Sequence, residues 1–112
     1  MERLEVIFED ESQLNVAKGI LHTLETDRKP VHWLDLFIIC SYGKTETYGR
    51  DCSRAVGAVL KDVVSGLKRG GYVTIHDKQG EKMQPGFVGD LIQLTEEAPR
   101  FIEENYPRVV QR

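Results

Sequence analysis

Cysteine is scarce in this chain, and its two cysteines, Cys40 and Cys52, stand alone. Neither belongs to a CxxC pair or to a cluster of His and Cys residues with the spacing of metal ligands. The three histidines, His22, His32 and His76, lie in different predicted elements and share no spacing. We therefore expect reduced, buried thiols, no disulfide framework and no metal ion.

Long hydrophobic runs are also missing. The longest, residues 36–40, is far shorter than the roughly 20 apolar residues that a membrane helix needs. The N-terminal stretch carries Glu2, Glu5 and Glu9 rather than the basic residues and apolar segment of a signal peptide. We expect a cytoplasmic protein that is not exported and has no contact with a membrane.

The motifs of common enzymes are absent from the sequence. Ser41, Ser53 and Ser65 have no accompanying arrangement of His and Asp, and the glycines at 80, 86 and 89 form neither GxGxxG nor a Walker loop. These absences favour a protein that is not an enzyme and uses no cofactor. An aromatic ligand pocket at Trp33 and Phe37 is a less favoured interpretation than ordinary core packing.

Positive charge is not in excess, since 15 Lys and Arg face 18 Asp and Glu, for a net charge of −3. Its distribution is uneven. Residues 1–35 hold four basic and eight acidic groups, residues 36–95 eight and six, and residues 96–112 three and four. Nucleic-acid binding depends on the charge of one face rather than on the net charge of the chain. The basic middle of the chain is therefore still compatible with nucleic-acid binding.

What the chain does contain is enough apolar sequence, 40% of 112 residues, for one core. We predict a single domain over residues 1–112. Alternation of Leu4, Val6 and Phe8 with acidic residues predicts an N-terminal strand. A helix capped by Ser12 follows to about Thr26, then a short extended link at residues 30–31.

Two more helices are predicted, one over "HWLDLFIICSYG" and one from about residue 51 to residue 69. Gly70 and Gly71 supply a left-handed cap that ends the third helix. "YVTIH" and "LIQL" then predict two strands of a hairpin around a polar loop. Thr95 is expected to cap a short C-terminal helix.

This order resembles a winged helix-turn-helix domain of the MarR-like and PadR-like bacterial regulators, over residues of about 14–97. The residues that carry the resemblance are "VSGLKRGGYVTI" and the closing "IQLTEEA". The turn before the third helix is longer than in the simple motif. The resemblance implies an α+β fold, with a three-helix core and a β-hairpin wing, to which this chain adds an N-terminal strand and a C-terminal helix.

One face of the third helix is rich in basic and small residues. A helical wheel places five positive charges there against only Asp51 and Asp62. Small residues let a helix approach the major groove, and Arg or Lys donates to bases and phosphates. The predicted DNA-binding residues of this helix, the segment before it and the hairpin are Thr45, Thr47, Tyr48, Arg50, Ser53, Arg54, Gly57, Ala58, Lys61, Ser65, Lys68, Lys78 and Lys82.

The predicted function is therefore that of a transcriptional regulator that binds double-stranded DNA; the sequence identifies no small-molecule effector. A solvated charged helix face is the plain alternative, and a protein-interaction module that docks through an acidic terminus is the alternative function. We also expect a homodimer, because a domain this small leaves the apolar residues of its termini poorly covered. Those residues are Leu4, Val6, Phe8, Phe101, Ile102, Tyr106, Val109 and Val110.

Overall fold

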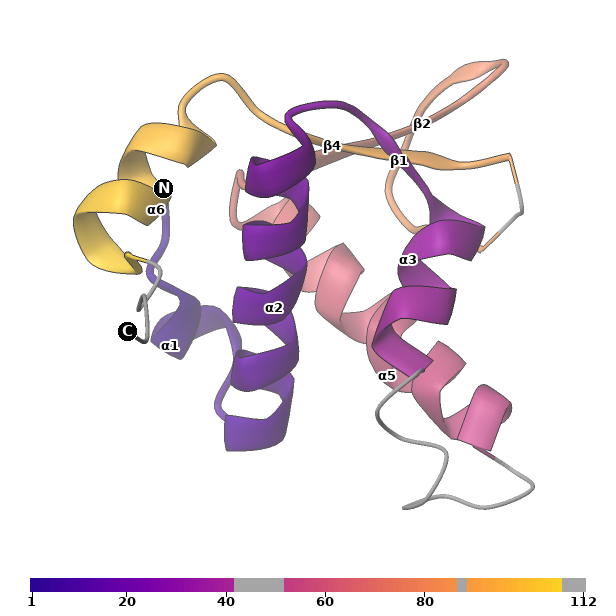
Figure 1. The fold of residues 1–112 in the computed structure, drawn as a ribbon, viewed down its shortest axis with the longest axis horizontal. Coiled ribbons are helices and arrows are strands. Elements are labelled where there is room, and N and C mark those ends of the chain that lie inside the picture. Colours follow the sequence, from indigo (N-terminus) through magenta and orange to yellow (C-terminus); the bar gives the residue numbers. More distant parts are fainter. Residues whose placement is uncertain (42–51, 87–88, 108–112) are drawn as a thin grey trace.

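The computed structural model describes residues 1–41, 52–86 and 89–107 of the chain. These residues form a mixed α and β structure with five helices and one antiparallel sheet of four strands (Figure 1). In chain order the elements are α1 (Leu4–Ile7), α2 (Glu11–Asp27), β1 (Val31–His32), α3 (Trp33–Ser41), α5 (Cys52–Arg69), β2 (Val73–Asp77), β3 (Gly80–Lys82), β4 (Leu91–Leu94) and α6 (Ala98–Asn105).

The N-terminal segment is a short helix, so the predicted N-terminal strand is wrong. Leu4 and Phe8 are four residues apart, which suits one face of a helix as well as one face of a strand. Both are buried, and the N–H of Phe8 donates to the carbonyl of Leu4 at 2.8 Å. Val6, which a strand would place beside them, is 69% exposed. The helical spacing therefore decides which side chains reach the core.

The long helix α2 is confirmed, but its cap differs from the prediction. Asp10 rather than Ser12 is the N-cap, and its Oδ1 accepts from the backbone N–H groups of Ser12 (2.8 Å) and Gln13 (3.2 Å). Further along, α2 buries one stripe of side chains that forms the centre of the core. That stripe consists of Ala17, Ile20, Leu21 and Leu24.

The glycine pair ends α5 as predicted. Gly71 adopts the left-handed conformation (φ 87°), and its N–H donates to the carbonyl of Lys68 at 3.2 Å. The N–H of Tyr72 reaches the carbonyl of Leu67 at 3.0 Å, and both side chains are buried. This pair of bonds is a Schellman motif, which turns the chain from α5 into β2.

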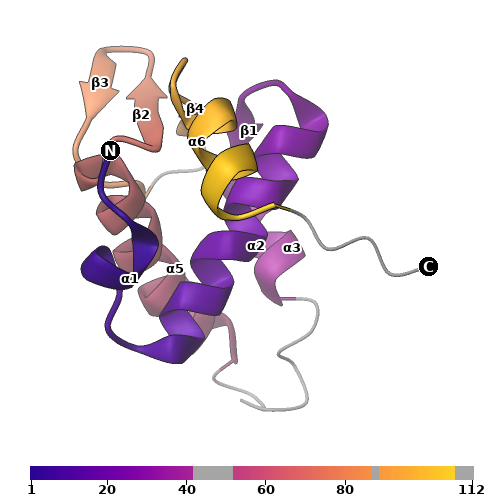
Figure 2. The ribbon, with the colours of Figure 1, turned by 90° about the vertical axis from the view of Figure 1, so that its left-hand side faces the viewer.

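The strands lie in the order β1-β4-β2-β3, across one end of the helices (Figures 1 and 2). The predicted hairpin is confirmed, since β2 pairs with β4 in the register Val73↔Leu94 to His76↔Leu91. Part of the predicted polar loop is the extra strand β3, which pairs with the end of β2. The predicted extended link at residues 30–31 overlaps β1, which pairs with β4 at the opposite edge.

The C-terminal helix is also confirmed, as α6. Its N-cap is Glu97, so the prediction of Thr95 at that position is wrong. The hydroxyl of Thr95 instead donates to the carbonyl of Gly71 at 2.7 Å. Thr95 therefore fastens the end of β4 to the turn that follows α5.

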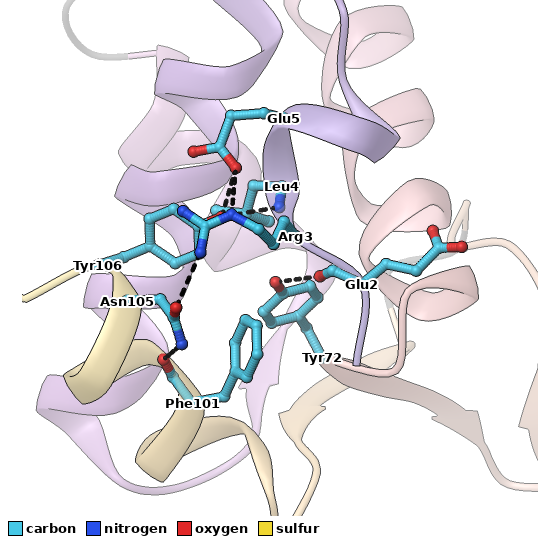
Figure 3. Close-up of polar contacts among 8 residues, drawn as sticks. All are labelled: Glu2, Arg3, Leu4, Glu5, Tyr72, Phe101, Asn105 and Tyr106. Atoms are coloured by element: carbon cyan, nitrogen blue, oxygen red, sulfur yellow. Dashed lines mark hydrogen bonds and ion pairs between the residues drawn. The ribbon is translucent and has the colours of Figure 1, made fainter.

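Two tyrosines join the N-terminal segment to the rest of the fold (Figure 3). The hydroxyl of Tyr106 accepts from the N–H of Leu4 at 2.9 Å and donates to Oε2 of Glu5 at 2.6 Å. The hydroxyl of Tyr72 donates to the carbonyl of Glu2. The hydrogen bond from Tyr106 holds the pKa of Glu5 below its usual range. Residues a hundred positions apart in the sequence are thus fixed together.

The terminal residues that motivated the dimer are mostly covered by their own chain. Leu4, Phe8, Ile102 and Tyr106 are buried in the core and Phe101 packs against it. Val109 and Val110 lie outside the described residues. The predicted poor covering of the termini is therefore wrong for most of these residues, and dimerisation stays a prediction without that support.

The glycines permit a matched test of the turn after α5. Because Gly71 has a positive φ, Gly71→Ala should lower the free energy of unfolding by about 1 kcal/mol. Gly19 lies inside α2 with nothing within 4 Å of an added Cβ, so Gly19→Ala should raise it by roughly 0.5 to 1 kcal/mol. Urea unfolding measures both. Equal stability of the Gly71 variant and the parent would show that the helix end is wrongly assigned.

Candidate nucleic-acid interface

Helix α5 divides into a buried stripe and an outer face. Its buried stripe consists of Leu60, Val63, Val64 and Leu67. On the outer face Ala58, Lys61, Asp62 and Arg69 are exposed. Four apolar residues at helical spacing fix the rotation of α5, so the exposure of the outer residues follows from the core.

The predicted contact residues before α5 cannot be placed. Thr45, Thr47, Tyr48 and Arg50 lie outside the described residues. Ser53 and Arg54 belong to the first turns of α5 by their backbone, and their side chains lie outside the described part as well.

The middle of α5 keeps two of the predicted contacts on its surface. Ala58 and Lys61 are exposed, and among the described residues no carboxylate forms an ion pair with Lys61. Gly57 is half-buried instead, because a Cβ there would lie 3.2 Å from the ring of Phe37 on α3. The absence of a side chain at Gly57 thus permits α3 and α5 to pack closely.

Ser65 does not lie on the exposed face, contrary to the wheel. It is 6% exposed, and its hydroxyl donates to the carbonyl of Lys61 at 2.7 Å. Ile7 of α1 and the following residue Phe8 lie beside this part of α5. A Cβ on Gly66 would lie 2.7 Å from the ring of Phe8, and one on Gly70 would collide with Ile7. Helix α1 therefore covers part of the outer face toward the C-terminal end of α5.

Two of the predicted lysines are neutralised by carboxylates. Lys68 forms an ion pair with Glu81 of β3, which holds the pKa of Glu81 below its usual range. Lys82 donates to both carboxylate oxygens of buried Asp90, at 2.9 and 2.8 Å. Lys68 therefore joins α5 to β3, and Lys82 joins β3 to the residue just before β4. The sequence did not predict this role.

The hairpin presents one of its predicted cations to solvent. Lys78 is exposed in the turn between β2 and β3. The turn is fixed by Asp77, whose Oδ1 accepts from the N–H groups of Gln79 (2.7 Å) and Gly80 (3.1 Å). Gly80 has a φ of 129°, which a residue with a side chain rarely adopts. Lys78 thus extends from a well-defined turn.

A cleft of about 260 Å³ lies where α1, α5 and the segment after β3 meet. It is lined by Ile7, Phe8, Gln13, Lys61, Asp62, Ser65, Arg69 and Gln84. Lys61 and Arg69 therefore line the same polar cleft as Gln84, which follows β3. In the described part of the chain, no group of three His, Cys, Asp or Glu residues could hold a metal ion.

Comparison of this chain with protein families, with curated proteins and with solved structures finds no match. In the described residues, no helix has the length and apolar character needed to cross a membrane.

The buried carboxylate of Asp90 gives a test of how the hairpin region is held. Asp90→Asn removes the charge that Lys82 pairs with, and we expect a loss of roughly 2 kcal/mol in the free energy of unfolding, since hydrogen bonds to charged groups contribute roughly 1.5–3 kcal/mol. Glu104→Gln is the matched control, because its pair with Arg100 is exposed and should contribute less than about 1 kcal/mol. Urea unfolding compares the two. If both variants lose the same small amount, Asp90 does not hold the hairpin.

Proposed function

We propose that this chain is a winged-helix protein that binds double-stranded DNA through the exposed part of α5, as a transcriptional regulator. In the described residues, α2, α3 and α5 follow α1 and precede the hairpin, and β1 between α2 and α3 pairs with β4 of the hairpin. This order and pairing are those expected of a winged helix-turn-helix, in which the third helix enters the major groove and the hairpin is the wing.

The observation that carries the proposal is the exposure of Ala58 and Lys61 on α5. A small residue lets the helix backbone approach the groove, and a cation one turn further on reaches a phosphate. Because Ser65 and the residues around it are buried, the proposed contact is the part of α5 up to Lys61. Arg54, one turn before Ala58, is our candidate for the contact to a base.

Ion pairs support a different proposal for two of the remaining basic residues. Lys68 and Lys82 are paired with carboxylates, so we assign them to stability rather than to DNA. Lys78 at the hairpin turn is exposed and is our candidate for a contact from the wing to the backbone. The proposed surface is therefore smaller than the sequence predicted, which implies modest affinity for one copy of the domain.

A protein-interaction module remains the second candidate, favoured by a different observation. Leu34 and Ile38 lie one turn apart on α3 and are 44% and 56% exposed. An apolar pair on an outer helix face suits a protein partner better than DNA. This second candidate moves the interaction surface from the acidic termini to α3.

Single substitutions separate a DNA contact from a solvated face. Lys61→Ala should weaken binding to specific and random duplexes alike and lower the salt slope by about one unit, because one phosphate contact is lost. Arg54→Ala should cost roughly 1 to 3 kcal/mol at a specific site and relax sequence preference. Fluorescence anisotropy with labelled duplexes at two salt concentrations measures both.

Lys18→Ala is the control, because it removes one positive charge from α2, beside Tyr106. It should leave DNA affinity close to that of the parent. Circular dichroism must show that every variant is folded. The proposal fails if the parent binds no duplex at low salt, or if folded Arg54→Glu, Lys61→Glu protein binds as the parent does; a protein partner on α3 then becomes the favoured function.

A further inference from the structure

A second cleft lies on the opposite side of α2 from α3, where the end of α2, strand β4 and helix α6 meet. Its volume is about 520 Å³, within the usual range for sites that bind small molecules. In Figures 1 and 2, α2 and α6 lie side by side at this end of the sheet. The apolar residues that line it are Leu24, Leu94 and Pro99.

Cations from two separate elements line this cleft. Arg28 and Lys29 follow the end of α2, and Arg100 belongs to α6. The carboxylates of Glu25 and Glu103 also line it, so the side chains carry three positive and two negative charges. Arg100 uses its Nε for Glu104, at 3.2 Å, and a guanidinium has two further amino nitrogens that donate.

The backbone of Arg28 is unusual for a residue with a side chain. In the described part of the chain it is the only residue other than glycine with a positive φ, at 52°. Its N–H donates to the carbonyl of Leu24 at 3.0 Å, so it ends α2 in a position that glycine fills most easily. An arginine here costs conformational free energy that glycine would avoid. That cost is explained if the guanidinium is used in the cleft.

We propose that this cleft binds a small organic anion, in which a carboxylate or a phosphate group is joined to a compact apolar body. Arg28 and Lys29 would hold the anionic group, since a guanidinium donates two parallel hydrogen bonds to carboxylate or phosphate oxygens. The apolar body would lie against Leu24, Leu94 and Pro99. The site is separate from the outer face of α5, so the proposal does not depend on DNA binding.

The test uses three probes of similar size on the full chain: phenyl phosphate, 3-phenylpropionate and phenethylamine. Nuclear magnetic resonance titration should show saturable shifts of the amide signals of Arg28, Leu94 and Thr95 with one or both anions, and none with the amine. Binding of only one anion decides between phosphate and carboxylate. The proposal is overturned if neither anion binds, if the shifts lie elsewhere, or if the amine binds equally well.

Arg28→Gly is the decisive variant, because it removes the guanidinium and suits the positive φ. Its melting temperature should equal or exceed that of the parent, while its affinity for the bound anion falls at least about tenfold through loss of charge-assisted hydrogen bonds. Lys18→Ala, which removes a cation that lies over the ring of Tyr106 and does not line the cleft, should keep the affinity of the parent. Unchanged affinity in the Arg28→Gly protein would contradict the assignment.

Discussion

The carboxylate of Asp90 is fully buried and lies between segments that are distant in the sequence. Lys82 of β3 donates to both of its oxygens, and the N–H of Gly86 donates to Oδ2 at 2.8 Å. The carbonyl of the same residue accepts from the N–H of Trp33, where α3 begins. A buried charge costs free energy unless it is paired and hydrogen-bonded, so the fold is stable only while these partners stay in contact with Asp90. The hairpin region thereby has a fixed position against α3.

The second constraint is the close approach of α1 to α5, which decides how much of α5 faces solvent. Gly66 and Gly70 leave room for Phe8 and Ile7, and the hydroxyls of Tyr72 and Tyr106 hold the segment that precedes these side chains. The consequence for function is direct. Residues 63–68 of α5 are engaged with their own chain, whereas Ala58 and Lys61 stay exposed.

Local periodicity predicted the elements that bury one regular stripe. The helices α2 and α5 and the strands β2 and β4 were found this way, because a spacing of 3.6 or two residues can be read within a short window. Helix α6 was predicted instead from Thr95 as a cap, and α3 from its apolar content. The N-terminal strand failed for the same reason, since Leu4 and Phe8 fit both periods. Choosing between them required Gly66 and Gly70, which lie far away in the sequence.

The candidate site was less predictable than the fold, because it depends on contacts between distant residues. A helical wheel identifies Lys61 as exposed, yet it cannot show that Ser65 is buried. Nor does it pair Lys68 with Glu81, or Lys82 with Asp90. Each of these pairs joins residues on different segments, and opposite charges that are scattered along a sequence do not indicate which of them will meet.

We propose that the exposed residues of α5 and the hairpin turn form one surface for DNA. Titration of isotope-labelled protein with a random duplex, followed by nuclear magnetic resonance, tests this claim most directly. We expect the amide signals of Ala58, Lys61 and Lys78 to shift together and reversibly with salt, while those of Phe101 and Glu103 on α6 stay unchanged. Shifts confined to α3 or α6, or no shifts at low salt, would contradict it.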